Sequence, residues 1–528
     1  MPADGSVRKP GVALPCHAAG PQIRWCVCVA RVSSTLRPNG LNRNKYGKLE
    51  HERQVVEPNR MHHETVTRLR RSLCWIVALG LTASRFVSAA DSAGNDAPTG
   101  PPTPASSWPM LLGVQYTLID QNQSRLRSPY SGPLSLNPDG DTEATNTVGL
   151  YTGWAPVGWE QMYLDVERFV GAGVSNATGL AGLTNGDIVR EGVSGIKKEF
   201  YIARLFARFM LPLGDAVEAV ARGQDQIPGT EAATRLEFKI GRMALPDDFD
   251  QNRYAGQART EFLNWSLWAN TAWDYAANTR GYTNGVVIGY ISPSWSLKYG
   301  IYLMPYLANF QQLDYSAQLA HGQNLQLTLS PWSAGPIVRL LGYLNTARMG
   351  IYQDALAIAA ATGSVPNIVA DNRNGRHKYG FGVNAEQPLA DNGDTGLFMR
   401  WGWDDGKTET FAFTEVDEEV SFGGQLAGNH WGRSDDRFGL ALVSEGLSAP
   451  HRQYLQAGGC GFLLCDGHLN YGHEQILETY YRFQYVWPEK PGPVRWQLGP
   501  DFQEIRNPGY NSDRGPVHFW ALRLHVEY

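Results

Sequence analysis

The last segment of the chain shows most clearly the pattern that governs this sequence. From Trp520 to Tyr528 every second residue is large and apolar, and the residues between them are Ala, Arg, His and Glu. An alternation of this period places the two sets on opposite faces of a β-strand. The same pattern recurs in segments 236–240, 297–303, 325–329, 397–403, 481–487 and 494–502. The chain is therefore predicted to consist mainly of β-strands.

Turn signals separate many of these segments. Asn-Gly or Asp-Gly, the dipeptides favoured in tight hairpins, occur at residues 284–285, 374–375, 405–406 and 466–467. The clearest is Asp405-Gly406, which has alternating runs on both sides. These signals predict consecutive antiparallel hairpins. One Ala-rich segment, 352–361, has a helical pattern that ends at Thr362-Gly363, and we expect this helix to lie in a loop.

Alternation alone fits both a soluble sandwich and a membrane barrel, so the composition of the two faces must decide. The solvent-exposed face of a β-sandwich is usually rich in Lys, Glu, Thr and Ser. Residues 91–528, however, contain 25 Arg and only 7 Lys. The apolar face is aromatic near strand ends, as at Trp401 and Tyr485, which is typical of the interfacial girdles of membrane barrels. We therefore expect an all-β, transmembrane antiparallel β-barrel.

The composition agrees with this choice. A mean hydropathy of −0.32 excludes a bundle of transmembrane helices, whereas a barrel wall averages lipid-facing and lumen-facing residues. Of the 46 basic and 51 acidic side chains, 14 and 5 lie before residue 91. The remainder therefore carries a net charge of −14, which makes nucleic acid an unsuitable partner.

The front of the chain differs from the rest. Residues 61–89 read as a signal peptide, with basic residues before the apolar stretch 73–81 and small residues near Ala89. Residues 1–60 carry no periodic pattern. They are interpreted as an unstructured segment that results from a start codon assigned too far upstream. Residues 90–107 resemble a flexible linker, and 108–528 is the predicted outer-membrane barrel domain.

Two cysteines, Cys460 and Cys465, lie in the predicted barrel domain. A spacing of five places them on opposite faces of a strand, so a bond between them requires a turn in the middle. We favour two free or loosely paired thiols.

From Leu245 onward the chain carries, in this order, the segments 249–255, 262–265, 272–275 with 280–282, 378–387, 401–406 and 507–516. In these segments the sequence resembles the carbohydrate-selective outer-membrane porins of the OprB type. The resemblance covers about residues 145–528; one departure is Cys465, where Gly is expected before Asp466-Gly467. It implies a bacterial outer-membrane barrel of sixteen strands, with short periplasmic turns, longer outer loops and passive diffusion of sugars.

The resemblance also implies partners. These are small sugars as transported solutes, outer-membrane lipid, and the barrel-assembly machinery, reached through the C-terminal strand that ends at Tyr528. It leaves open whether three barrels form a homotrimer. No cofactor or metal is predicted, and the sequence contains no Gly-x-Ser-x-Gly elbow, zinc-protease motif or phosphate-binding glycine loop.

A sugar-selective pore needs many weak hydrogen bonds that replace hydration without trapping the solute. Arg suits this task because its planar fork offers several fixed donors, and carboxylates accept hydroxyl protons. Strand parity points one set of charged side chains inward: Arg204, Arg208, Arg235, Glu237, Lys239, Arg400, Arg482, Arg523 and Glu527.

A second set of candidates follows the strand near residue 240. Asp247, Asp248, Asp250, Asn252 and Arg253 form a polar cluster predicted to fold into the lumen as a constriction, and Arg259 and Glu261 lie close behind it. Trp268 is the candidate stacking platform for a sugar ring. For each charged residue, an Arg–carboxylate ladder that stiffens the wall is the competing interpretation.

Two other functions compete with a porin. An outer-membrane or secreted hydrolase would need paired carboxylates, for which the candidates are Asp404/Asp405 and Asp435/Asp436. Both pairs adjoin turn residues, which favours solvated hairpins. A secreted sugar-binding β-sandwich is the third alternative.

Overall fold

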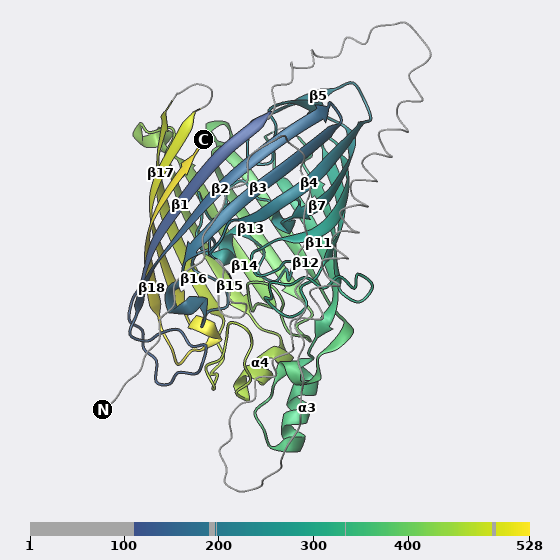
Figure 1. Cartoon of the computed structure of the whole chain (residues 1–528). Coiled ribbons are helices and arrows are strands. Elements are labelled where there is room, and N and C mark those ends of the chain that lie inside the picture. Colours follow the sequence, from purple (N-terminus) through teal and green to yellow (C-terminus); the bar gives the residue numbers. More distant parts are fainter. Residues whose placement is uncertain (1–109, 189–195, 197, 333, 488–492) are drawn as a thin grey trace, which may run out of the picture. The chain divides into compact units, whose positions relative to one another are not determined.

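The computed structural model describes residues 110–188, 196, 198–332, 334–487 and 493–528. The predicted start, signal peptide and linker, residues 1–107, lie outside these ranges. Within them, sixteen strands form one closed antiparallel barrel (Figure 1). A closed barrel excludes the sandwich and confirms the strand number that the family resemblance implied.

The barrel strands follow the order of the chain. They are β1 (Leu111–Gln123), β2 (Asp141–Val157), β3 (Glu160–Gly171), β4 (Tyr201–Pro212), β7 (Arg235–Met243), β8 (Thr283–Ile291), β9 (Trp295–Leu303), β10 (His321–Leu329), β11 (Ile337–Met349), β12 (Arg373–Ala390), β13 (Thr395–Asp404), β14 (Glu418–Ala427), β15 (Arg437–Gly446), β16 (Glu474–Trp487), β17 (Val494–Arg506) and β18 (Val517–Glu527). β1 closes the barrel by pairing with β18, Leu118 opposite Leu524. A separate two-stranded hairpin consists of β5 (Val217–Val220) and β6 (Gly229–Ala232).

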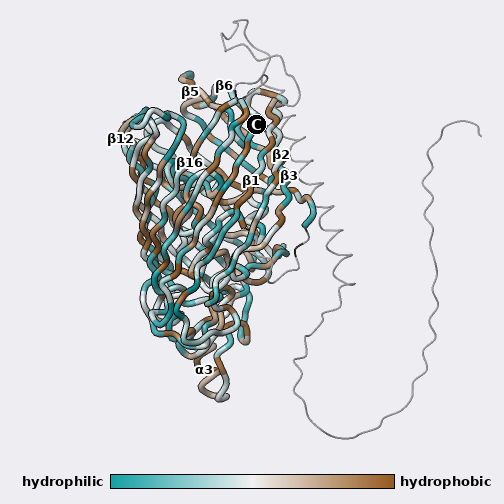
Figure 2. Tube along the Cα trace, turned by 90° about the vertical axis from the view of Figure 1, so that its left-hand side faces the viewer, coloured by the Kyte–Doolittle hydropathy of each residue, from teal (hydrophilic) through white to brown (hydrophobic). Residues whose placement is uncertain are grey.

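The faces of the strands are divided as the alternation predicts. In β18, Trp520 and Leu522 are 59% and 52% exposed on the outside, whereas Arg523 and His525 are 3% and 2% exposed on the inside. Figure 2 shows hydrophobic and hydrophilic residues interleaved along the barrel strands. The outer wall is therefore apolar and the inner wall polar.

Connections of different length occupy the two ends of the barrel. Long loops form one end, called here the loop end, and their described residues are 124–140, 172–188, 196, 198–200, 244–282, 304–320, 350–372, 405–417, 447–473 and 507–516. The other end, the turn end, carries the described residues 158–159, 213–234, 292–294, 330–332, 334–336, 391–394, 428–436 and 493. In Figure 1 the helices α3 and α4 lie at the loop end, and β5 lies at the turn end near the C-terminus.

Helices are short and lie in the connections. They are α2 (Trp265–Trp268), α3 (Tyr352–Thr362) and α4 (Ala449–Gln456), with the 3-10 turns η1 (Val174–Ala177), η2 (Leu245–Asp247), η3 (Ile368–Asp371), η4 (Asp391–Gly393), η5 (Gly428–Trp431) and η6 (Pro508–Tyr510). Helix α3 confirms the predicted helix, and Gly363 ends it with a φ of 68°. Over the described ranges, no helix combines the length and apolarity needed to cross a membrane.

The predicted tight hairpins are wrong at all four dipeptides. Residues 284–285 and 374–375 lie inside β8 and β12. Gly406 has the positive φ of a turn residue, but the chain then continues through a loop until β14 begins at Glu418. Gly467 likewise turns within loop 447–473. These dipeptides favour a local turn, but they do not decide which segment pairs after it.

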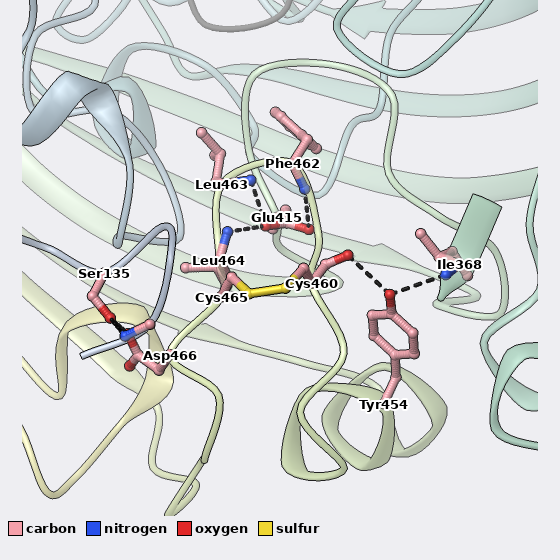
Figure 3. Close-up of a disulfide and its surroundings, with 11 residues drawn as sticks. Ser135, Ile368, Glu415, Tyr454, Cys460, Phe462, Leu463, Leu464, Cys465 and Asp466 are labelled. Carbon is pink, nitrogen blue, oxygen red and sulfur yellow. Dashed lines mark hydrogen bonds between the residues drawn. A yellow bond between two sulfur atoms is a disulfide. The ribbon is translucent and has the colours of Figure 1, made fainter. Parts of the chain in front are cut away.

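Of the two alternatives favoured for the cysteines, free or loosely paired thiols, the first is wrong, because Cys460 and Cys465 form a disulfide (Figure 3). The intervening residues turn around the carboxylate of Glu415, which accepts hydrogen bonds from the amides of residues 462–464. The turn required by the spacing therefore exists, and a carboxylate from another loop shapes it.

Candidate functional site

Loop 244–282 folds into the barrel, and carboxylates of the wall hold its backbone. Glu478 on β16 accepts hydrogen bonds from the amides of Leu263 and Asn264, the latter at 3.0 Å. Glu419 on β14 accepts one from the amide of Thr271 at 2.9 Å. Because buried amides must find acceptors, this row of wall carboxylates gives the loop its position.

Arg400 of β13 anchors the middle of this inserted loop. Its side chain is fully buried, and its Nε lies 3.1 Å from the Asp250 carboxylate. Its two terminal nitrogens donate to the carbonyls of Leu267 and Ala255, both at 2.6 Å. The five donors of a guanidinium can satisfy several acceptors of one loop at once.

A second buried cation lies closer to the loop end. Lys378 of β12 is 3.2 Å from Asp404 and 3.7 Å from Asp274 of the inserted loop. Asp274 also accepts hydrogen bonds from the amides of Phe411 and Ala412. Lys378 therefore binds the inserted loop to the wall and, through Asp274, to loop 405–417.

Glycines on the inner wall allow this close approach. A Cβ at Gly402 would lie 2.1 Å from Asn270 Oδ1, and one at Gly396 would lie 2.2 Å from the Tyr254 hydroxyl. Any side chain at either position would displace the inserted loop from the wall.

Beside the inserted loop the barrel encloses a polar cavity of about 1120 Å³. It is lined by β4, β7 and β9, by the inserted loop, and by hairpin 213–234. Of the seventeen residues predicted to line a pore, the structure places thirteen on this cavity: Arg204, Arg208, Arg235, Glu237, Lys239, Asp247, Asp248, Asp250, Asn252, Arg253, Arg259, Trp268 and Glu527.

Arg204 of the lining lies among three carboxylates. Its guanidinium binds the Asp247 carboxylate through two hydrogen bonds of 2.7 and 2.8 Å. Asp165 and Asp225 each lie 3.2 Å from it. Burial acts to raise the pKa of Asp247, but the charge and hydrogen bonds of Arg204, together with the charge of Lys239 and the Ala244 amide, hold that pKa below its usual value.

Arg208 and Lys239 of the cavity also pair with carboxylates and extend this ladder. Arg208 lies 2.6 Å from both Glu231 and Glu237. Lys239 lies 2.9 Å from Asp248. These pairs fix the donors and acceptors that face the lumen, as the competing interpretation of an Arg–carboxylate ladder expected.

Comparison with known proteins identifies the family. The model of the carbohydrate-selective porin OprB family matches residues 172–528. The chain belongs to the OprB family. No curated protein matches the sequence.

The structure of one solved OprB porin supports this fold. The high-pH structure of Pseudomonas putida OprB matches with a TM-score of 0.58 at 16% identity, over 79% of this chain and 94% of that one. The outer-membrane channel DcaP of Acinetobacter baumannii matches with a TM-score of 0.43 at 9% identity, over 79% and 96%. Family and fold assign this OprB-type porin to the bacterial outer membrane.

Four residues predicted to line the pore of this OprB-type barrel are not on the cavity: Glu261, Arg400, Arg482 and Arg523. The three arginines point inward, but the inserted loop covers them, because Arg482 and Arg523 donate to the carbonyls of Thr260 and Ala258. Glu261 accepts hydrogen bonds from the loop amides of Gly256 and Gln257. Burial raises the pKa of Glu261 to about 7, although these amides oppose the rise.

Other lining residues were not predicted. Lys298 of β9 and Glu167 of β3 line the cavity, and their strand parity could have indicated both. Asp225 also lines it, but it lies in a connection, where no alternation shows which way a side chain points.

Two side chains of the inserted loop offer surfaces to a solute in this OprB-type cavity. Trp268 is half-buried and packs against Trp265, whose ring stacks on Phe413 at 4.6 Å. Arg253 is exposed, and within the described chain its guanidinium has no carboxylate within 4 Å. It makes one long hydrogen bond, of 3.4 Å, to the Gly393 carbonyl. Arg253 therefore has donors available for a ligand.

Proposed function

We propose that the barrel allows passive diffusion of mono- and small oligosaccharides, with the loop end outside the cell and the turn end in the periplasm. The observation that carries this is the polar cavity of about 1120 Å³ inside a closed barrel, lined by fixed cations and carboxylates. Such a lining replaces sugar hydration with many hydrogen bonds, none strong enough to trap the solute.

The proposal includes the other parts of the chain and its partners. Residues 61–89 act as an export signal, and 108–528 form the barrel in contact with outer-membrane lipid. The strand that ends at Tyr528 is the segment expected to engage the assembly machinery, and association into a homotrimer is open to test.

No catalysis is proposed. The two carboxylate pairs that a hydrolase would use lie away from the cavity lining. Asp404 instead binds the buried Lys378, and Asp436 binds Arg433. Asp404 and Asp436 are therefore structural groups, each bound to a cation of the barrel.

Swelling of liposomes that contain the purified protein tests the proposal. Influx should fall as the sugar becomes larger. Liposomes that stay intact in every sugar would overturn the porin assignment, and intact liposomes with sugar cleavage would favour a hydrolase.

Replacing Arg253 by alanine should raise single-channel conductance by some tens of per cent and weaken block by sugar. The reason is that an exposed, unpaired guanidinium is removed from the lumen while the ladder stays intact. Planar-bilayer recordings measure both quantities. Arg253→Lys keeps the charge and is the control; an Arg253→Ala channel identical to the wild type would exclude this residue from the constriction.

Replacing Trp268 by alanine should weaken sugar block about fivefold, the equivalent of roughly 1 kcal/mol of lost apolar contact. Conductance without sugar should rise less. The measurement is the sugar concentration that halves the ion current. Trp520→Ala, on the outer wall, is the matched control. Equal half-blocking concentrations in the two variants would refute a stacking role.

A further inference from the structure

One connection at the turn end is built differently from the rest. Residues 213–234 join β4 to β7 and contain the β5–β6 hairpin, whereas neighbours such as 158–159 and 292–294 are minimal turns. We call 213–234 the exit hairpin and residues 221–228, between its two strands, the hairpin tip. A backbone bridge pairs Gly223 with Gln226 in this tip.

The hairpin tip docks on the inner wall of strands that lie beyond β4 along the barrel, β3 and β1. Ile227 is 7% exposed, and its amide donates to the Tyr163 hydroxyl of β3 at 3.3 Å. Gln224 donates to the Asp165 carboxylate of β3 at 2.6 Å and accepts from Gln115 of β1 at 3.3 Å. The exit hairpin therefore crosses from β4 and β7 to β3 and β1 within the barrel.

The tip also reaches the seam at which the barrel closes. Arg222 donates to the Leu112 carbonyl of β1 at 2.6 Å and to the Tyr528 carbonyl, just after β18, at 3.2 Å. Its guanidinium lies over the Tyr528 ring, 5.5 Å from the centroid. This contact fixes the far end of the exit hairpin.

Two wall arginines hold the exit hairpin from the side of its base. Asp225 of the tip lies 3.2 Å from Arg204, the same guanidinium that binds Asp247 of the inserted loop. Glu231 of β6 is bound by Arg208 at 2.6 Å. Arg204 thus joins a segment from the loop end to a segment from the turn end.

The tip faces the cavity as well as the wall. Ala221, Gln224, Asp225 and Gln226 of the tip line the same cavity as the inserted loop, as do Ala219 and Val220 of β5. A solute in this cavity therefore has these residues beside it at the turn end.

We propose that the hairpin tip is a second constriction of the channel, at which Gln224 and Asp225 present polar groups to the sugar after it has passed the inserted loop. This rests on the proposed function, because it assumes that sugars traverse the cavity. The tip sets an upper size for the solute independently of loop 244–282.

Shortening the tip tests the proposal directly. A variant in which two glycines replace residues 221–228 should show a higher single-channel conductance, and in liposome swelling it should admit sugars that the wild type excludes. His430→Ala, on another connection at the turn end, should behave like the wild type. An unchanged conductance and size limit in the shortened channel would overturn the proposal.

A cysteine pair keeps the test valid if the shortened chain does not fold. The side chains of Gln115 and Gln224 meet at their amide ends, so in Gln115→Cys/Gln224→Cys a reducible bifunctional thiol reagent can cross-link the tip to β1. The cross-linked channel should keep the wild-type conductance, and reduction should raise it, because the hydrogen bonds of Gln224 are then absent. The wild type under the same reductant is the control for Cys460–Cys465. Equal conductance of the cross-linked and reduced variant would contradict a constriction.

Titration of Asp225 gives an independent readout. The groups that face it are Arg204, Asp165, Asp247, Lys239 and Tyr163. Burial raises the pKa of Asp225 well above its usual value; Arg204 and Lys239 oppose this rise, and the neighbouring carboxylates add to it. The docked tip therefore binds a proton more tightly than a released tip, so docking weakens as the pH rises above the ordinary Asp value.

Conductance should accordingly increase with pH in the wild type and stay flat in Asp225→Asn, which mimics the protonated group. An equal pH dependence in both would refute the role of Asp225. Wild-type liposomes that admit no sugar would instead contradict the proposed function itself.

Discussion

Replacing Arg400 by alanine is expected to release the inserted loop and convert a narrow channel into a wide one. The substitution removes the cation beside Asp250 and leaves the carbonyls of Leu267 and Ala255 without their donors. Removing one partner of a buried ion pair costs about 3–5 kcal/mol. The loop should therefore leave the wall in a large fraction of molecules, and conductance should rise several-fold.

Planar-bilayer recording and liposome swelling measure this effect. Arg400→Lys keeps the positive charge but lacks the planar guanidinium with its several donors. Its conductance should therefore lie between those of the wild type and the alanine variant. Arg339→Ala is the matched control, because Arg339 lines the cavity and pairs with Glu386 of the wall. A stable, narrow Arg400→Ala channel would show that the wall carboxylates hold the loop without it.

Replacing Lys378 by methionine should have the largest effect on stability. Its ammonium is fully buried between Asp404 and Asp274, which are 0% and 1% exposed. Methionine fills the space but leaves two buried carboxylates facing each other without a cation. The expected loss is about 3–5 kcal/mol of folding free energy, and it should be partly recovered in Lys378→Met/Asp404→Asn.

The temperature at which the folded barrel changes its migration on a detergent gel reports this loss. Lys407→Met is the control: Lys407 is 64% exposed and 3.9 Å from Asp405, and exposed pairs of this kind contribute little. If the two methionine variants lose their folded migration at the same temperature, Lys378 does not support the barrel.

Alternation in the sequence was sufficient to predict the two faces of the wall. The inward direction of Arg204, Arg235 and Lys239 follows from strand parity alone, and the structure places all three on the cavity. The number of strands did not follow from alternation, because closure depends on how strands pair. It came from the resemblance to a family.

The contents of the barrel could not be predicted in the same way. Parity says that Arg400 and Arg523 point inward, but it does not say that a loop distant in sequence covers them. The exit hairpin and the Cys460–Cys465 disulfide were missed for a similar reason, since each is shaped by side chains from other segments. The position of a residue along a strand determines which way its side chain points. Which segments contact that side chain depends on the assembled fold.

The segments that carry the family resemblance have a common structural task. In segment 249–255, Asp250 contacts Arg400 and Tyr254 contacts Gly393. In segment 272–275, Asp274 contacts Lys378. Gly402 has no side chain that would clash with the inserted loop. These contacts of the motifs therefore specify the packing of the loop on the wall, whereas Arg253 of the same segment 249–255 faces the cavity.

The bonds of Arg222 carry a consequence for the order of assembly. Its two acceptors, on Leu112 and Tyr528, become neighbours only when the first and last strands pair. The inserted loop likewise needs acceptors on β14 and β16 that are in place only late in synthesis of the chain. The Arg222 bonds therefore form only when the cylinder closes, and the loop is held only once β14 and β16 are in place. We expect the channel to reach its final bore as the last step of folding, after the wall itself is complete.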